Sequence, residues 1–295
     1  MELYIFVAII AYLAFAVNGV MDKFLLRQSI PEPVVYTFFT AMLGAVVVVL
    51  IPFGFFVPPL PTVILAFVSG LTFLAALFCL FSSLKRNDAS RVLPTVGALN
   101  PLFAFVFSYW LLAERLEPVQ VTGIAFLVVG MLAVSDDTHV TKQERHWFAY
   151  AFTAAVFFSL SFTIARMVFL QAGFITGLIW KQFGFVLGGL ALLFIPAVRK
   201  KIFYRSARVR TERKFLFLVS QTAGVSGGLL QNYAISLGSV TIVNALQGVQ
   251  FIFLFFLTYL LSRLTTVLRE DFSKKEIVRK LGGIILLGLG LIFII

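Results

Sequence analysis

The sequence predicts an all-α integral membrane protein with ten transmembrane helices, arranged as two inverted five-helix repeats. Three observations lead to this fold class. Of the 295 residues, 60% are hydrophobic and only 13% are charged, which is too little polar surface for a water-soluble domain of this size. The apolar residues come in blocks of roughly 20, the length that crosses about 30 Å of hydrocarbon. Polar positions in the first half also recur in the second.

Charge clusters, prolines and glycines divide the chain into ten candidate spans. The first block is too long and too weakly basic at its start for a cleavable signal peptide, so we interpret it as a membrane helix. The connections are short and leave no room for a separate soluble domain. In chain order the spans are 3–22, 34–56, 62–83, 90–112, 118–135, 147–170, 174–197, 215–236, 240–262 and 278–295.

Basic residues indicate the orientation of these spans. All but three of the 24 Lys and Arg residues lie in loops that ten spans would place on one side; the exceptions are Arg115, Arg166 and Lys181. Because basic loops stay in the cytoplasm, we expect a protein of the plasma (inner) membrane with both termini outside. The basic run at 198–214 could grip phosphates, but we favour a loop that faces anionic lipid headgroups. No nucleic-acid partner is therefore expected.

Two segments of the first half align with segments of the second half. AYLAFAVNGVMDKFLL matches AAVFFSLSFTIARMVFL at an offset of 143, which pairs Lys23 with Arg166. The segment that contains Asn100 matches the one that contains Gln250 at an offset of 150. These matches suggest a duplication.

An odd number of spans in each half would give the two copies opposite orientations in the membrane. We therefore predict a first repeat over residues 1–138 and a second over residues 139–295. Inverted repeats of this kind are typical of secondary transporters, whose substrate site lies near the midplane between the halves.

The segment GALNPLFAFVFSYWLLAERLEPVQVTGIAFLVVGMLAV, residues 97–134, resembles the closing part of an EamA-type repeat in the drug/metabolite transporter superfamily. Its features are a proline-interrupted helix, the pair Glu114-Arg115 at the helix end, and a following span with Gly123 and Gly130. The second half departs from this pattern, because no Glu-Arg pair follows Leu261. The resemblance implies a ten-helix secondary transporter of small metabolites.

The segment GALNPLF also carries Asn100 and Pro101 at the centre of an apolar run. A proline lacks the N–H that a helix needs, so we expect a kink or a break there. The second half has QGVQ, residues 247–250, near the matching position. Irregular backbone at membrane depth is tolerated where it lines a cavity, so we expect both segments to border a central site.

Polar side chains within the spans are the candidates for substrate binding, because each is costly in lipid unless it faces protein or water. Lys181 could bind a carboxylate or a phosphate of the substrate, pair with an acid, or lie at the interface if the outer loop is longer. Asp22 is a candidate site for a coupling proton or cation. The predicted substrate-binding residues are Asn18, Asn100, Trp180, Lys181, Gln182, Asn244, Gln247 and Gln250.

Motifs for catalysis, nucleotides and metals are missing from the sequence. His139 and His146 could in principle bind a metal, but we interpret their loop as solvated, and we expect neither a metal nor a cofactor. The sequence therefore predicts a non-enzymatic transporter that exports a small metabolite such as an amino acid by alternating access, with membrane lipids around it. The alternatives are a flippase or multidrug exporter for lipids or amphipathic drugs and, in another class, an intramembrane enzyme or receptor. The oligomeric state stays open.

Overall fold

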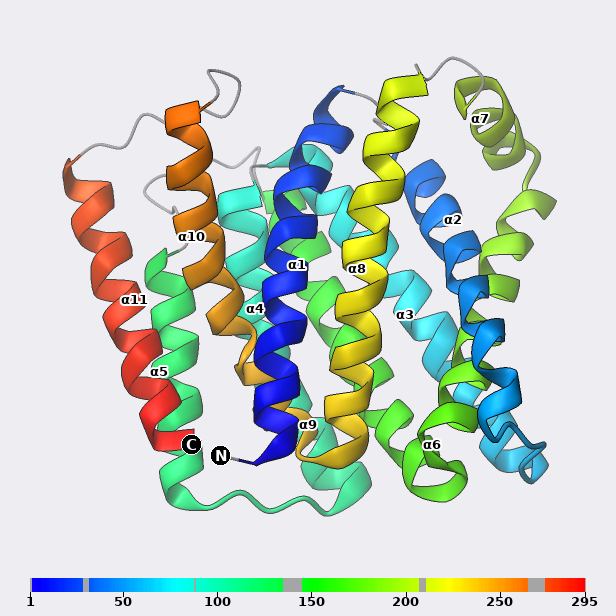
Figure 1. Ribbon diagram of the computed structural model, residues 1–295, viewed down its shortest axis with the longest axis horizontal. Coiled ribbons are helices and arrows are strands. Elements are labelled where there is room, and N and C mark those ends of the chain that lie inside the picture. Colours follow the sequence, from blue (N-terminus) through cyan, green and yellow to red (C-terminus); the bar gives the residue numbers. More distant parts are fainter. Residues whose placement is uncertain are drawn as a thin grey trace.

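The computed structural model describes residues 2–28, 32–87, 89–134, 145–206, 211–264 and 274–294, and within these ranges the chain forms helices and no strand (Figure 1). The helices are α1 (Leu3–Gln28), α2 (Pro33–Leu43), η1 (Gly44–Phe53), α3 (Leu60–Arg86), α4 (Ala89–Leu112), α5 (Pro118–Val134), α6 (Arg145–Ala191), η3 (Leu192–Phe194), α7 (Pro196–Ser206), α8 (Thr211–Leu237), α9 (Val240–Ala245), α10 (Gln247–Leu264) and α11 (Lys274–Ile294).

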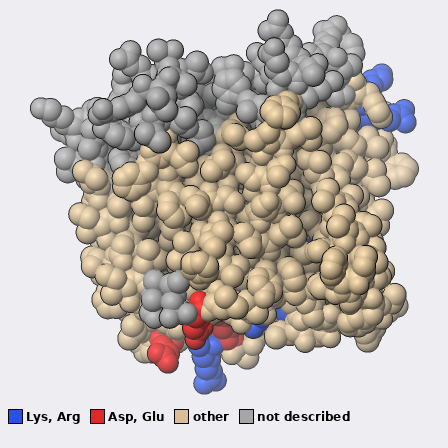
Figure 2. Space-filling model, viewed as in Figure 1, with Lys and Arg blue, Asp and Glu red and all other residues tan. Residues whose placement is uncertain are grey.

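The composition of these helices is that of a multi-pass membrane protein. Four stretches are long and apolar enough to cross a membrane, and shorter apolar helices accompany them. Large apolar side chains such as Trp110 (78% exposed) and Ile292 (73%) point outward. Figure 2 shows that on one face the visible charged side chains of the described residues lie at the two ends, with an uncharged band between them. Such a band matches the hydrocarbon layer.

Each predicted span overlaps a helix, but the helix boundaries differ from those predicted. Helix α1 continues to Gln28, well beyond the apolar block, because hydropathy marks the membrane-embedded part of a helix and not its end. Helix α7 covers the first part of the basic run at 198–214, which was predicted to be a loop. Its start follows the rule for proline at a first helical position, since Pro196 has no N–H to leave unpaired. The number of membrane crossings stays a prediction.

Helix α6 turns sharply at Gly173, at the gap predicted between spans 147–170 and 174–197. Gly173 has φ 70° and ψ 169°, a conformation that only glycine adopts at low cost. The two arms of α6 consequently run in opposite directions, and the turn lies at the end of the molecule that also holds both chain ends (Figure 1).

Glycines allow several helices to approach one another closely. A Cβ placed on Gly123 of α5 would lie 2.9 Å from the carbonyl oxygen of Gly290 of α11. One placed on Gly130 would lie equally close to the carbonyl oxygen of Gly283. Small residues at such contacts are typical of helix packing in membranes. The principal contacts elsewhere join α3 to α6 and α1 to α8.

Candidate functional site

A cavity of about 190 Å³ lies in the middle of the helical bundle. Both halves of the chain contribute to it, through α1, α2, α3 and α4 on one side and α6, α8 and α10 on the other. Its wall is mostly apolar, with phenylalanine and leucine side chains surrounding a few amides and one ammonium group. The polar side chains that line it are Tyr12, Asn18, Thr40, Asn100, Lys181, Gln182, Gln221, Gln231, Asn232, Gln247 and Gln250.

Six of the eight residues predicted from the sequence line this one cavity: Asn18, Asn100, Lys181, Gln182, Gln247 and Gln250. Asn244 lies immediately behind the wall, where it hydrogen-bonds Asn100. Trp180 lies away from the cavity, since its ring packs against Phe55 and Phe67. Adjacent residues on a helix are about 100° apart, so Trp180 and Lys181 face different surroundings.

Lys181 is the most unusual side chain of the cavity. It is only 2% exposed, and its Nζ donates to Asn232 Oδ1 at 2.8 Å. The ammonium also lies 5.0 Å from the ring centroid of Phe73 and 5.1 Å from that of Phe162, which are cation–π distances. Asn232 is held in the matching orientation, because its Nδ2 donates to the Gly228 carbonyl at 2.7 Å. Of the alternatives for Lys181, this burial argues against the interfacial one.

Two glycines set the position of Lys181 by bringing α3 and α6 together. A Cβ placed on Gly70 would lie 2.1 Å from the carbonyl oxygen of Lys181, and one placed on Gly184 would lie 2.7 Å from the Cα of Phe67. No side chain fits at such distances, so the backbones themselves are in contact. The close contact of α3 and α6 therefore holds the backbone of Lys181 rigidly, with its side chain directed toward the cavity.

Asn100 joins helices of both halves. Its Nδ2 donates to Asn244 Oδ1 at 3.0 Å and to Gln247 Oε1 at 3.5 Å. Ser159 Oγ lies 2.8 Å from the carbonyl oxygen of Asn100 and 2.6 Å from its Oδ1. The side chain that looked misplaced in an apolar helix thus has partners on both of its polar atoms.

Of the kink or break expected at Pro101, the break does not occur, because helix α4 continues through this residue. A proline removes one backbone hydrogen bond, and close packing with neighbouring helices makes such a residue tolerable inside a membrane helix. In the second half the interruption is real: α9 ends at Ala245 and α10 begins at Gln247. The two segments that border the cavity are therefore irregular to different degrees.

A second group of amides lies toward the ends of α1 and α8 that carry the basic loops. Asn18 Nδ2 donates to the carbonyl oxygen of Ser220 at 3.0 Å. Gln250 Nε2 donates to the Phe15 carbonyl at 3.3 Å, and Gln221 Nε2 donates to the Tyr36 hydroxyl at 3.2 Å. These contacts fix the amides in place. The side chains of Asp22 and Lys23, on the next turn of α1, lie outside the described part of the structure.

The cavity reaches much closer to one end of the bundle than to the other. Its wall includes Leu84, two residues before the end of α3 on the side of the basic loops. Toward the opposite side a buried cluster closes it, in which Tyr12 Oη donates to the Val243 carbonyl at 2.7 Å and accepts from Gln231 Nε2 at 3.2 Å. The cavity therefore extends close to the helix ends that carry the basic loops, and the cluster around Tyr12 closes it toward the opposite end.

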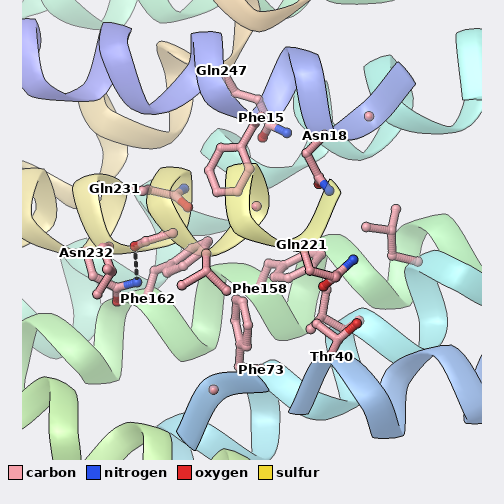
Figure 3. A pocket seen from close by; sticks show the side chains of 18 of the residues that line it. Phe15, Asn18, Thr40, Phe73, Phe158, Phe162, Gln221, Gln231, Asn232 and Gln247 are labelled. Carbon is pink, nitrogen blue, oxygen red and sulfur yellow. Dashed lines mark hydrogen bonds between the residues drawn. The ribbon is translucent and has the colours of Figure 1, made fainter. Parts of the chain in front are cut away.

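Several lining residues were not predicted from the sequence. Figure 3 shows the rings of Phe73, Phe158 and Phe162 among the polar groups, with Asn232 on one side. Phenylalanine is so frequent in this chain, with 35 residues, that no local signal separates lining rings from lipid-facing ones. Asn232 is recognisable as a polar residue near a span end, but its contact with Lys181 spans 51 residues.

The described residues contain no group of three His, Cys, Asp or Glu that could hold a metal ion. His139, which was considered in that role, lies outside the described residues. Lys181 is the one charged side chain among the described residues that line the cavity. The chemistry offered there is hydrogen bonding, one positive charge and apolar contact.

Comparison with known proteins gives a family match over part of the chain and a similar solved fold. The family model of the EamA-like transporter family matches residues 2–136, and this family is part of the drug/metabolite transporter superfamily. No curated protein matches the sequence. Among the solved structures that match, one crystal structure of a protein has a TM-score of 0.63 at 17% identity and covers 97% of this chain and 96% of its own. This likeness shows the same fold over nearly the whole length.

Proposed function

We propose that this chain, whose first half belongs to the EamA-like transporter family, is a secondary transporter that exports a small metabolite such as an amino acid or a related compound. The observation that carries the proposal is the central cavity, which residues of both halves line and which contains polar groups inside the helical bundle. Such groups are costly unless they meet a solute, water or one another. Transport, not catalysis, is the activity that this lining supports.

Two hydrogen bonds that each join a helix of one half to a helix of the other support the arrangement of the halves as inverted repeats. Ser161 Oγ donates to the Ser69 carbonyl at 2.7 Å, which joins α6 to α3. Asn18 Nδ2 donates to the Ser220 carbonyl at 3.0 Å, which joins α1 to α8. Asn18 and Ser161 are separated by the offset of 143 that also pairs Lys23 with Arg166. We therefore assign residues 1–138 and 139–295 to the two repeats.

We infer alternating access from the asymmetric position of the cavity, which the cluster around Tyr12 closes toward one end. The cluster around Tyr12 joins α1 to the chain around α9, so a transporter must break it to open the closed end. The same motion would bring the apolar walls together at the other end. The sequence contains no nucleotide-binding motif, and we propose that a gradient of the solute or of a coupled proton or cation drives the cycle.

The positive-inside rule supports a cytoplasmic position for the end that carries the basic loops, in a plasma membrane. In Figure 1 both chain ends lie opposite α7, whose basic residues include Arg199 and Lys201. A phosphatase fused to the C-terminus should be active outside the cell, and a fluorescent protein fused there should stay dark. A fluorescent fusion with inactive phosphatase would reverse the orientation.

A flippase or multidrug exporter for amphipathic compounds is the second candidate, favoured by the rings of Phe73, Phe158 and Phe162 in the wall. It differs from the first in its substrates: lipids or hydrophobic drugs would be carried, and small polar metabolites would not. The solute counterflow assay described next distinguishes these two candidate functions.

Solute counterflow in proteoliposomes tests the proposal. Vesicles loaded with one candidate solute are diluted into the same labelled solute, and a carrier accumulates the label transiently. We expect counterflow for at least one small metabolite. We also expect at least about a tenfold lower rate for Asn100→Ala and for Gln250→Ala, because each removes a hydrogen-bonding amide from the wall.

The matched control is Tyr109→Phe, at a half-exposed position on the outer surface of α4, which should transport normally. All variants must elute as monodisperse protein. Unchanged counterflow in both amide variants would mean that these residues only pack helices. Absence of counterflow for every solute class would contradict the proposed transport function.

A further inference from the structure

The polar groups of the cavity are divided between two ends. Lys181 and Asn232 form one end, deep in the bundle, and Gln221 and Thr40 lie at the other (Figure 3). Gln221 and Asn232 belong to the same helix and are eleven residues apart, which corresponds to about 16 Å at the rise of an α-helix. Phenyl rings lie between the two ends. The wall is therefore charged at the deep end, apolar in the middle, and polar but neutral at the other end.

The deep end carries a positive charge that no acidic side chain among the described lining residues balances. An ammonium has three donors, and Asn232 Oδ1 is the acceptor that Lys181 Nζ meets at 2.8 Å. The described residues that line the cavity include no Asp or Glu. Burial of a charge is expensive unless it is paired, and the rings of Phe73 and Phe162 offset only part of that cost.

We propose that Lys181 is the anion-binding group of the transport site and that the solute is a small organic monocarboxylate with an apolar body. The inference rests on the proposed transport function and adds the chemical class of the solute. The carboxylate would pair with Lys181 Nζ at the deep end. The apolar body would lie against Phe73, Phe158 and Phe162.

The charge of the site favours a carboxylate over a phosphate. One ammonium neutralises one negative charge, whereas a phosphate monoester carries up to two at neutral pH. The second charge would be buried among phenyl rings, where an unpaired charge is strongly unfavourable. A sugar phosphate would also place its hydroxyl groups against an apolar wall.

The shallow end can receive a hydrogen-bond donor of the solute. Gln250 and Gln221 use their amide nitrogens within the protein, since these donate to the Phe15 carbonyl and to the Tyr36 hydroxyl. Their oxygens can therefore accept from an amino or hydroxyl group. Amino acids with apolar side chains and plain acids share the chemistry that Lys181 recognises, and they differ at this end.

The experiment uses purified full-length protein and four matched probes in thermal-shift and counterflow assays. 3-Phenylpropionate and 3-phenylpropionamide differ in the charge at one end. 2-Phenylethylphosphonate carries a larger negative charge on a similar body, and phenylalanine adds an amino group. A charge-assisted hydrogen bond contributes enough for the wild-type protein to bind 3-phenylpropionate at least about tenfold more tightly than the amide. The phosphonate should bind at least about tenfold more weakly than the carboxylate.

Lys181→Met removes the charge and keeps the length of the side chain. We expect the variant to lose the preference for carboxylate over amide, to within about twofold, while Lys181→Arg keeps part of it. Trp180→Phe, at the adjacent residue outside the cavity, should keep the full preference. The wild-type comparison needs no variant, so the proposal stays testable if Lys181→Met does not fold.

The outcomes separate this inference from the proposed function. Equal binding of 3-phenylpropionate and its amide by the wild-type protein, or an unchanged preference in Lys181→Met, contradicts the inference even if neutral solutes show counterflow. Tighter binding of the phosphonate contradicts it as well. Selective, Lys181-dependent binding of the carboxylate without any counterflow would support the proposed anion-binding site. The same result would contradict the proposed transport function. Better binding of phenylalanine than of 3-phenylpropionate would assign an amino acid to the site.

Discussion

Helices α3 and α6 meet more closely than helices α1 and α8, although both pairs join the two halves through similar hydrogen bonds. Ser69 and Ser161 are fully buried, and the backbones beside them touch at Gly70. Along α8 the contact is close at Gly227 but opens one residue later, where a Cβ on Gly228 would have no atom within 4 Å. The same architecture thus provides a rigid support for Lys181 on one side and room for a solute on the other.

The largest expected effect comes from filling the tight interface. Gly70→Leu would bring a side chain into contact with the carbonyl of Lys181, and a backbone group cannot rotate away as a side chain can. Overpacking of this kind costs about 3 kcal/mol or more, so we expect loss of monodisperse protein in detergent or a large drop in the melting temperature. Size-exclusion chromatography and thermal unfolding would measure both.

The matched change on the open side is Gly228→Ala, which should leave the melting temperature nearly unchanged. If Gly70→Leu proved as stable as Gly228→Ala, the two interfaces would not differ in packing. This result would contradict the claim that tight packing of α3 against α6 supports Lys181 rigidly.

An intermediate effect is expected at the closed end of the cavity. Tyr12→Phe removes the hydroxyl that donates to the Val243 carbonyl and accepts from Gln231. Loss of such a contact costs about 1 kcal/mol, which corresponds to roughly a fivefold shift toward the state with this end open. Cysteine labelling from that side should increase accordingly, while Tyr109→Phe should leave it unchanged. A decrease would mean that Tyr12 does not hold the closed end together.

The smallest stability effects are expected for the two equivalent hydrogen bonds. Asn18→Ala and Ser161→Ala should each destabilise the fold by only about 0.6 kcal/mol, the average for hydrogen bonds between membrane helices. Their effects on transport should differ, because Asn18 lines the cavity and Ser161 does not. We expect counterflow to fall at least about tenfold in Asn18→Ala and to stay near the wild-type rate in Ser161→Ala. Equal rates would contradict the difference between the interfaces.

Much of this fold follows from the sequence because a membrane restricts the choices of the chain. Apolar blocks locate the helices, and the gap before Phe174 corresponds to the turn at Gly173. Helix α7 was missed because its basic residues looked like a loop, although Pro196 and the buried Ile202 are helix and packing signals. Whether Pro101 would kink or break its helix stayed open, since the packing around it is tertiary and cannot be inferred from the sequence of one helix.

The site was predictable in part for the same reason. Polar residues inside apolar spans are rare, so Asn100 and Lys181 attracted notice without any structural knowledge. Trp180 was included because it is adjacent in sequence, and helical geometry turns it away. Asn232, which fixes Lys181, lies on another helix and was not linked to it, because one sequence shows no contact between distant residues.

The central claim, that solutes pass through this cavity from alternating sides, is tested most directly by a cysteine at Gly228 in a Cys79→Ala background. Gly228 lines the cavity and has room for a side chain. We expect a membrane-impermeant thiol reagent to label this cysteine from the side of the basic loops, and Tyr12→Phe to make it accessible from the other side as well. Absence of labelling from either side would contradict the claim and leave the cavity as a closed void.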